Sequence, residues 1–296
     1  MKTGVIGLGA MGAPMARNLH RTGYLAAVWN RTMEKSRQLA DELDVPVAVE
    51  PAALAQNCDL VILSVSADAD VLEVIETMLP GVHAGTVVVD TSTISRDTAR
   101  EAAARLQKAK AEYLDAPVSG GMEGARNGTL AMMVGGEAEV LRRVRPVLDS
   151  IARRIEHMGP VGAGQATKAV NQVMAAGINQ AVSEALAFAA ALELPLDKVI
   201  EVIGSGAAGN WFLAHRGPTM TRGNYEPGFR IALHHKDLTI CKQMAAQFGV
   251  ALPMVEMTLI HYRRLMEAGL GDLDISALHH EKQGLFASDG KHPKRP

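Results

Sequence analysis

The chain is poor in cysteine and nearly balanced in charge, and both properties exclude classes of protein. Of 296 residues only Cys58 and Cys241 are cysteines, which excludes a disulfide-built scaffold and is typical of the reducing cytoplasm. The net charge is −2, so no overall field attracts nucleic acid or an anionic membrane surface. We expect a cytoplasmic protein whose partners are small molecules and other subunits. We expect no metal site.

Long uninterrupted apolar runs are also lacking. Glycines break the apolar start of the chain and no small-residue cleavage site follows, so we expect no signal peptide. The alanine-rich stretch 164–194 contains Lys168, Asn171, Glu184 and further polar residues, which are too many for a membrane span. This stretch predicts a long buried helix of a globular protein instead.

Short apolar runs alternate with helical patterns in the first half of the chain, which predicts a parallel, doubly wound α/β sheet. The second half has only helical patterns. We therefore predict a Rossmann domain over 1–162, joined by a long helix to an all-α domain over 163–287, and a frayed tail over 288–296. The expected strands are 3–6, 25–29, 60–64, 87–90, 112–114 and 130–134, and the expected C-terminal helices are 165–192, 196–203, 236–248, 253–268 and 276–285.

A glycine-rich loop, GLGAMG, spans residues 7–12 between a strand pattern and a helical one. In a dinucleotide-binding loop the first glycine allows a tight turn, the second lets the backbone approach the pyrophosphate, and the third lets the helix pack on the strand. The helix N-terminus then faces phosphate charge. The alternative is a plain glycine-rich turn, but the strand–loop–helix setting favours a nicotinamide cofactor. The predicted contacts are Gly7, Leu8, Gly9, Ala10, Met11 and Gly12.

The end of the second strand lacks the acidic residue that usually binds the ribose hydroxyls of NAD. Asn30, Arg31 and Thr32 stand there and offer donors and a cation. Because such groups suit the extra phosphate of NADP, we predict NADP in preference to NAD. The alternative is that Arg31 is solvated or stacks on the adenine of either cofactor.

Two polar loops follow later strands. DTST occupies 90–93 and DAPVSGG occupies 115–121. The carboxyl ends of the strands of an open α/β sheet form its ligand crevice, so both loops point to one place. Thr93 is a candidate for the nicotinamide ribose, and Ser119 with the N–H groups of Gly120 and Gly121 for a substrate carboxylate. The alternative is a pair of turns whose Asp and Ser side chains bond their own backbone.

The third motif, GAGQATKAVNQ at 162–172, opens the long helix. Lys168, Asn171 and Gln172 are spaced i, i+3 and i+4 and therefore share one helix face. An amine with a pKa lowered by burial exchanges a proton with a substrate oxygen during alcohol–carbonyl interconversion, and Asn171 is suited to hold that substrate. A lone lysine is usually solvated, but apolar neighbours at 166, 169, 170 and 173 favour burial here.

These motifs, in this order and spacing, resemble the β-hydroxyacid dehydrogenase family, which includes 3-hydroxyisobutyrate dehydrogenases and tartronate, glyoxylate and succinic semialdehyde reductases. HHKDL at 234–238 and GLGDLDIS at 269–276 resemble its C-terminal signatures, so the likeness covers nearly the whole chain. It implies NAD(P)-dependent interconversion of short 3-hydroxyacids and their semialdehydes or oxo acids.

The resemblance also implies roles for particular residues. Lys168 becomes the acid/base, assisted by Asn171, while Ser119, Gly120 and Gly121 hold the substrate carboxylate, and Thr93 and Lys236 lie at the cofactor. Some relatives carry Asn where Gln172 stands, so either Asn171 or Gln172 touches substrate. The family's long helix pairs subunits, which implies a homodimer or homotetramer.

Two alternatives remain open: an imine reductase, which commonly lacks a lysine at position 168, and a non-catalytic NADP(H)-binding sensor, which would normally have lost it. The pattern does not select one hydroxyacid or the direction of reaction. Trp211, Phe212 and Phe229 are candidates for the pocket wall, although aromatics in helical domains are more often core.

Overall fold

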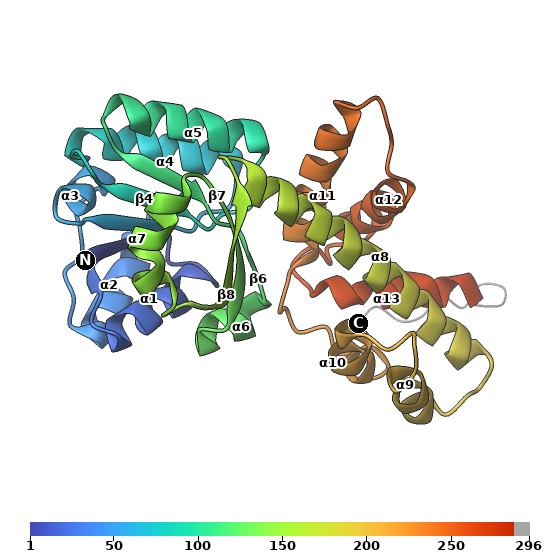
Figure 1. The fold of residues 1–296 in the computed structure, drawn as a ribbon. Coiled ribbons are helices and arrows are strands. Elements are labelled where there is room, and N and C mark those ends of the chain that lie inside the picture. Colours follow the sequence, from blue (N-terminus) through green and yellow to red (C-terminus); the bar gives the residue numbers. More distant parts are fainter. Residues whose placement is uncertain (287–296) are drawn as a thin grey trace. The chain divides into compact units, whose positions relative to one another are not determined.

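The computed structural model describes residues 1–286, so the predicted tail at 288–296 lies outside the described residues. The chain forms two compact units: an N-terminal unit, Met1–Lys168, and a C-terminal unit that begins at Ala169. The predicted class, a Rossmann-type sheet followed by a helical domain, is confirmed (Figure 1). The predicted boundary after residue 162 falls at the start of the long helix, and the division into units falls inside that helix.

One eight-stranded sheet forms the centre of the N-terminal unit, in the order β2-β1-β3-β4-β5-β7-β6 with β8 beside β7. The first five strands are parallel, and β7 runs antiparallel to β5 and β6. The strands are β1 Thr3–Ile6, β2 Leu25–Trp29, β3 Leu60–Leu63, β4 Val87–Asp90, β5 Glu112–Asp115, β6 Val118–Ser119, β7 Leu130–Gly135 and β8 Ala152–Gly159.

The sheet is not parallel throughout, because β7 runs antiparallel to β5 and β6 at this far edge, and the two strands β6 and β8 were not predicted. β6 has two residues, too few for any periodic signal. β8 is an edge strand with most of its side chains exposed, including Arg153 and Arg154, so it lacks the apolar run of a central parallel strand. The six predicted strands each correspond to an observed strand, since each contains a short apolar run that the fold buries at least in part.

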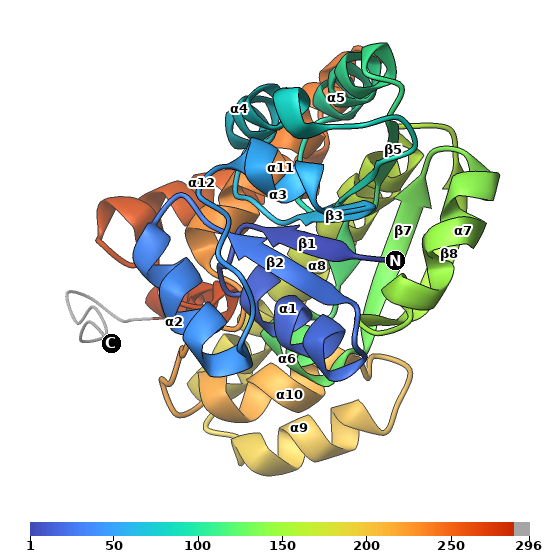
Figure 2. The same ribbon diagram turned by 90° about the vertical axis from the view of Figure 1, so that its left-hand side faces the viewer.

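Helices cover both faces of the sheet, as its alternating side chains require. Val5 and Ile62 face a core shared with α1, α2, α6 and α7, whereas Ile6 and Val61 face a core shared with α3, α4 and α5. Figure 2 shows α4 and α5 across the sheet from α1. These helices are α1 Gly12–Arg21, α2 Met33–Leu43, α3 Pro51–Gln56, α4 Asp68–Met78, α5 Arg96–Lys108, α6 Gly121–Asn127 and α7 Ala138–Leu148.

The C-terminal unit is helical and packs around the greater part of α8. Ala176, Val182 and Leu186 of α8 share one apolar core with residues of the other helices. The helices are α8 Ala163–Ala191, α9 Leu196–Gly204, α10 Trp211–Met220, α11 Ile231–Ala246, α12 Pro253–Glu267 and α13 Leu278–Gln283. Short 3-10 turns, Ile275–Ala277 and Gly284–Phe286, flank α13.

The helices differ from those predicted at two points. α10 was not predicted; Asn210 starts it by accepting a hydrogen bond from the Leu213 N–H at 2.9 Å, and Gly217 and Pro218 lie near its end. Pro218 lies only two residues before the helix ends, where it interrupts little. α11 begins at Ile231, five residues before the predicted start at 236.

By length and composition α8 is apolar enough to cross a membrane, although one such helix is weak evidence for a membrane protein. Its buried polar side chains have protein partners within the C-terminal unit. The Asn179 amide donates to the Tyr262 hydroxyl at 3.0 Å and to the Ile275 carbonyl at 2.8 Å. These contacts are those of a core helix.

Candidate active site

The glycine loop between β1 and α1 has the geometry that its sequence predicts. Gly7 has a φ of +93°, and a Cβ on Gly7 would collide with the Ser64 carbonyl oxygen. A Cβ on Gly12 would collide with the Gly7 carbonyl oxygen, so the helix start and the turn touch directly. A Cβ on Gly9 would meet only open space. Gly9 and Ala10 are exposed, whereas Leu8 is buried, so the exposed backbone of this loop is what a dinucleotide would reach.

Asn30 braces this loop from the end of β2. Its amide oxygen accepts a hydrogen bond from the Leu8 N–H at 2.8 Å, and its amide nitrogen donates to the Thr32 carbonyl at 3.1 Å. Both polar atoms of Asn30 are therefore used within the protein, which leaves Arg31 as the exposed group with charge to offer a phosphate.

Arg31 has two acidic neighbours that the sequence did not reveal. Its guanidinium lies 2.9 Å from the carboxylate of Asp70 and 3.9 Å from that of Glu73, both on α4. An exposed pair of this kind contributes only about 0–1 kcal/mol. A bound phosphate therefore competes readily with Asp70 for Arg31, but the two carboxylates oppose its negative charge.

The DTST loop after β4 is held by its own acidic and hydroxyl side chains. The Asp90 carboxylate accepts hydrogen bonds from the Ser92 N–H and the Tyr113 hydroxyl, both at 2.9 Å, and complete burial raises the pKa of Asp90 to about 6. The Ser92 hydroxyl accepts from the Val65 N–H at 2.9 Å. Asp90 and Ser92 thus serve the backbone, as the alternative interpretation has it, while Thr93 stays partly exposed.

Lys168 lies beside the second polar loop. Its side chain is only 8% exposed, and its ammonium donates to the Val118 carbonyl at 2.8 Å, directly before Ser119. Gly120 and Gly121 are exposed and have φ values of +126° and +60°, a backbone path that glycine adopts without strain. The structure therefore brings together the lysine and the predicted carboxylate cradle, which are about fifty positions apart in sequence.

In the C-terminal unit a chain of side chains links the other predicted residues. The Asn171 amide donates to the Gln172 side-chain oxygen at 2.7 Å, and the Gln172 amide donates to the Asp237 carboxylate at 2.7 Å. The Lys236 ammonium lies 2.9 Å from the other Asp237 oxygen. Gln172 is buried with both ends of its amide engaged, whereas Asn171 is partly exposed. Asn171 is therefore better placed to meet a substrate.

Asp237, only 4% exposed, joins residues that the sequence had singled out in the C-terminal unit, and the sequence reasoning did not include it. One buried carboxylate here receives both an amide and an ammonium that the sequence had singled out. The available signal was an acidic residue directly after Lys236 in the HHKDL motif. No metal-binding cluster of His, Cys, Asp or Glu occurs within residues 1–286.

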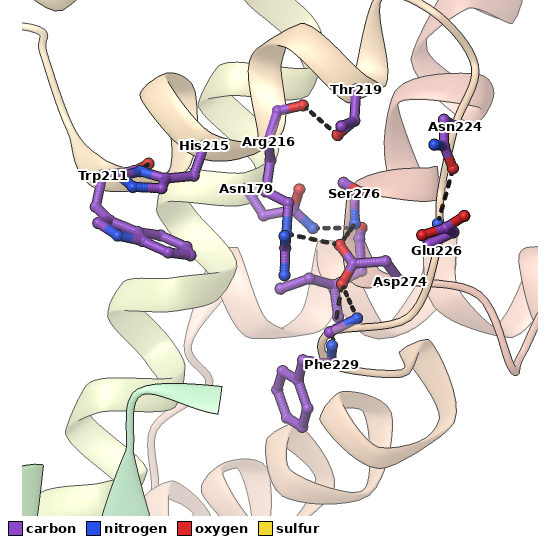
Figure 3. Close-up of polar contacts among 12 residues, drawn as sticks. Asn179, Trp211, His215, Arg216, Thr219, Asn224, Glu226, Phe229, Asp274 and Ser276 are labelled. Atoms are coloured by element: carbon purple, nitrogen blue, oxygen red, sulfur yellow. Dashed lines mark hydrogen bonds and ion pairs between the residues drawn. The ribbon is translucent and has the colours of Figure 1, made fainter. Parts of the chain in front are cut away.

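The aromatic candidates differ in exposure, and Figure 3 shows two of them, Trp211 beside His215 and Phe229 on another segment. Trp211 is 57% exposed and stacks on His215, with ring centroids 4.3 Å apart. Phe229 is partly buried, and its ring lies 5.2 Å from that of His234. Phe212 is partly buried against the core of the C-terminal unit. Trp211 therefore has the free surface that a pocket wall needs, while Phe212 is mainly core.

Asp274, from the GLGDLDIS signature, fixes the turn before α11. Its buried carboxylate accepts from the N–H groups of Gly228 at 2.9 Å and Phe229 at 3.0 Å, and lies 3.3 Å from the Arg216 guanidinium. Figure 3 shows these contacts converging on one carboxylate. Because α11 follows this turn and carries Lys236 and Asp237, Asp274 helps to position these two residues by holding the backbone in front of their helix.

Comparison with known proteins agrees with the order of motifs. Residues 2–159 match the NAD binding domain of 6-phosphogluconate dehydrogenase, and residues 162–281 match the NAD-binding family of NADP-dependent 3-hydroxyisobutyrate dehydrogenase. An uncharacterized oxidoreductase of Shewanella frigidimarina is 40% identical over 94% of this chain and 96% of its own. The 2-hydroxy-3-oxopropionate reductase of Escherichia coli is 36% identical over 94% of this chain and 96% of its own.

A solved structure is equally similar. The 3-hydroxyisobutyrate dehydrogenase of Mycobacterium tuberculosis, with L-serine, is 35% identical, with a TM-score of 0.85 over 95% of this chain and 98% of its own. The chain belongs to the β-hydroxyacid dehydrogenase family. It is thus an oxidoreductase with NAD(P)-binding domains, and the family assignment made from its motifs is confirmed.

Proposed function

We propose that the protein is an NADP(H)-preferring reductase that interconverts a short 3-hydroxyacid and its semialdehyde or oxo acid. The observation that carries this proposal is the position of Lys168: a buried ammonium, 2.8 Å from the Val118 carbonyl, next to the Ser119–Gly120–Gly121 loop. A proton donor thus lies beside main-chain N–H groups suited to a carboxylate. The reduction of a 3-oxo acid needs a proton donor for the carbonyl oxygen and a binding group for the carboxylate.

The residues divide the reaction between them. Ser119 and the N–H groups of Gly120 and Gly121 bind the substrate carboxylate, so the carbonyl carbon is oriented before reaction. The reduced nicotinamide, when bound, supplies the hydride to that carbon. Lys168 gives a proton to the carbonyl oxygen as the C–O bond becomes single, and takes it back in the oxidation. Asn171 donates a hydrogen bond to the substrate.

The preference for NADP rests on Arg31. The acidic residue that would hold the ribose hydroxyls of NAD is lacking after β2, and the Arg31 guanidinium is exposed there. A carboxylate at this place would repel the additional phosphate, whereas a guanidinium binds it with two hydrogen bonds. The pairing of Arg31 with Asp70 makes the expected preference moderate.

The experiment that tests this function measures oxidation of NADPH and NADH by the purified protein with glyoxylate and with tartronate, succinic and methylmalonate semialdehydes. The reverse reaction is measured with 3-hydroxyisobutyrate, 3-hydroxypropionate, glycerate and serine. NADPH-dependent reduction of a semialdehyde or oxo acid supports the proposal. Preference for NAD would overturn the cofactor argument alone. Reduction of ketimines without activity toward any carboxylic acid would overturn the whole.

We further propose that the functional form is a homodimer or homotetramer. Val170 and Met174 of α8 are 68% and 63% exposed, and Phe188, Met254 and Phe286 line an apolar groove of about 380 Å³ on the C-terminal unit. Exposed apolar side chains that gather on one helix and beside a groove are the kind of surface that subunits bury on association. Light scattering on the purified protein should give twice or four times the 31.5 kDa chain mass. A monomer would contradict the proposal.

A further inference from the structure

The start of α8 is held by Asp115 at the end of β5. One carboxylate oxygen accepts from the Gly162 N–H at 2.7 Å, and the other from the Gln165 N–H at 2.8 Å. A carboxylate across the first turn satisfies N–H groups that have no partner inside the helix. A Cβ on Gly164 would collide with the carbonyl oxygens of Met133 and Asp115, so the helix approaches the sheet as closely as backbone allows.

The side chain of Gln165 connects this helix start to the DTST loop. Its amide nitrogen donates to the Ser92 carbonyl at 2.8 Å, and its amide oxygen accepts from the Ile94 N–H at 3.2 Å. Gln165 is 1% exposed. Its two partners are main-chain groups on either side of Thr93, and a primary amide supplies the donor and the acceptor that they need.

Lys168 follows Gln165 by three residues, less than one turn of the same helix. The Gln165 amide therefore fixes where the lysine backbone stands relative to Thr93, and the Val118 carbonyl fixes the ammonium at 2.8 Å. We infer that Gln165, held by Asp115, is a positioning residue that sets the Lys168 ammonium against the DTST loop. This inference rests on the proposed function, in which Lys168 delivers the proton and the DTST loop lies at the cofactor.

The reaction makes this spacing important. Proton and hydride must reach the two atoms of one carbonyl group, and a misplacement of about 1 Å costs up to roughly a hundredfold in rate. Gln165 touches neither group directly, so its loss should change the spacing and leave both binding surfaces present. The expected signature is a lower kcat with little change in the KM values.

The first variant is Gln165→Met, which keeps the volume and removes both hydrogen bonds. We expect kcat to fall about ten- to a hundredfold, with both KM values within about threefold of wild type. The matched control is Asn179→Leu, which removes from the same helix a buried amide that donates to Tyr262 and Ile275 and accepts from Ser183. It should lower the melting temperature similarly and leave kcat within about twofold. An equal loss of kcat in both variants would overturn the inference.

The second variant is Gln165→Glu. An ionised glutamate still accepts from the Ile94 N–H but repels the Ser92 carbonyl, whereas a protonated glutamate supplies both a donor and an acceptor as the amide does. The kcat of this variant relative to wild type should therefore rise as the pH is lowered. A ratio that does not change with pH would contradict the positioning role.

A measurement independent of turnover separates this inference from the proposed function. Amide hydrogen exchange at Ile94 should be faster in Gln165→Met than in wild type, because its acceptor is gone. Unchanged exchange at Ile94 would overturn the inference, whatever the substrate panel shows. Faster exchange at Ile94 in a protein that is inactive toward every 3-oxo acid would support the connection and reject the proposed function.

Discussion

The two units assemble their functional groups in different ways. In the N-terminal unit the loops at strand ends present main-chain atoms: the glycine loop after β1, the DTST loop after β4 and the Gly120–Gly121 backbone. In the C-terminal unit side chains connect the functional groups, from Asn171 through Gln172 to Asp237 and Lys236. Loops that present main-chain atoms can be predicted from short sequence motifs. A series of hydrogen-bonded side chains depends on contacts between helices that are distant in sequence.

Lys168→Ala is expected to have the greatest effect, because it removes the proton donor of the N-terminal unit. Turnover should fall roughly 10²- to 10⁴-fold, the usual contribution of a general acid or base. NADPH binding, measured by fluorescence titration, should be retained. The exposed lysine of α9 offers a control, and Lys198→Ala should keep full activity. Retained turnover in Lys168→Ala would reject the acid/base role.

Asp90→Asn tests whether the buried charge of Asp90, which holds the DTST loop, lowers the stability of the folded protein. Burial raises the pKa of Asp90 to about 6, above the ordinary value near 3.9, so the folded state binds the proton more tightly than the unfolded state. The contribution of Asp90 to stability is therefore fully present below about pH 4 and lost as the pH rises through about 6, a change on the order of 3 kcal/mol.

The Asn variant keeps the acceptor for the Ser92 N–H without the charge. It should be more stable than wild type above about pH 6, and the difference should shrink toward about pH 4. Denaturant unfolding at several pH values measures this. A constant difference between the two proteins across that range would show that the pKa of Asp90 is the same in the folded and unfolded states.

Asp237→Leu tests the side-chain chain of the C-terminal unit. It leaves the buried Gln172 amide and the partly exposed Lys236 ammonium without their shared acceptor, and the unpaired amide alone costs about 1–3 kcal/mol of stability. Because Gln172 then no longer holds Asn171 in place, kcat/KM should fall roughly ten- to a hundredfold. Asp272→Asn is the control, since Asp272 is 87% exposed and only pairs with Arg230. Equal values of kcat/KM in the two variants would show that Asp237 has no role in the reaction.

The smallest effects are expected at the cofactor phosphate. Arg31→Ala should weaken NADPH binding about tenfold and NADH binding little, because one charge-assisted contact is lost. Asp70→Asn should strengthen NADPH binding about two- to fivefold by freeing Arg31 from its carboxylate. Dissociation constants for both cofactors measure these changes, with the exposed Arg142→Ala as control. A uniform loss for NADPH and NADH in Arg31→Ala would place Arg31 at the adenine.

The sequence predicts the architecture well where periodicity is strong. The buried strands β1 to β5 and the long helix α8 follow from their apolar patterns, and the glycine loop from its setting. The edge strand β8 was not predicted because pairs of charged or polar residues separate its few apolar ones. Asp70, Gln165, Asp237 and Asp274 escaped because each acts through a contact with a position far along the chain. Linear spacing carries no information about such contacts.

The contacts of Gln165 have a consequence for how this protein diverges. The side-chain amide of Gln165 bonds the Ser92 carbonyl and the Ile94 N–H, and these main-chain groups remain whatever side chains stand at 92 and 94. A mutation in the loop thus creates no need for a compensating change at 165. Pairwise covariation across descendants of this sequence would give no sign of the contact, even though the glutamine itself would change slowly.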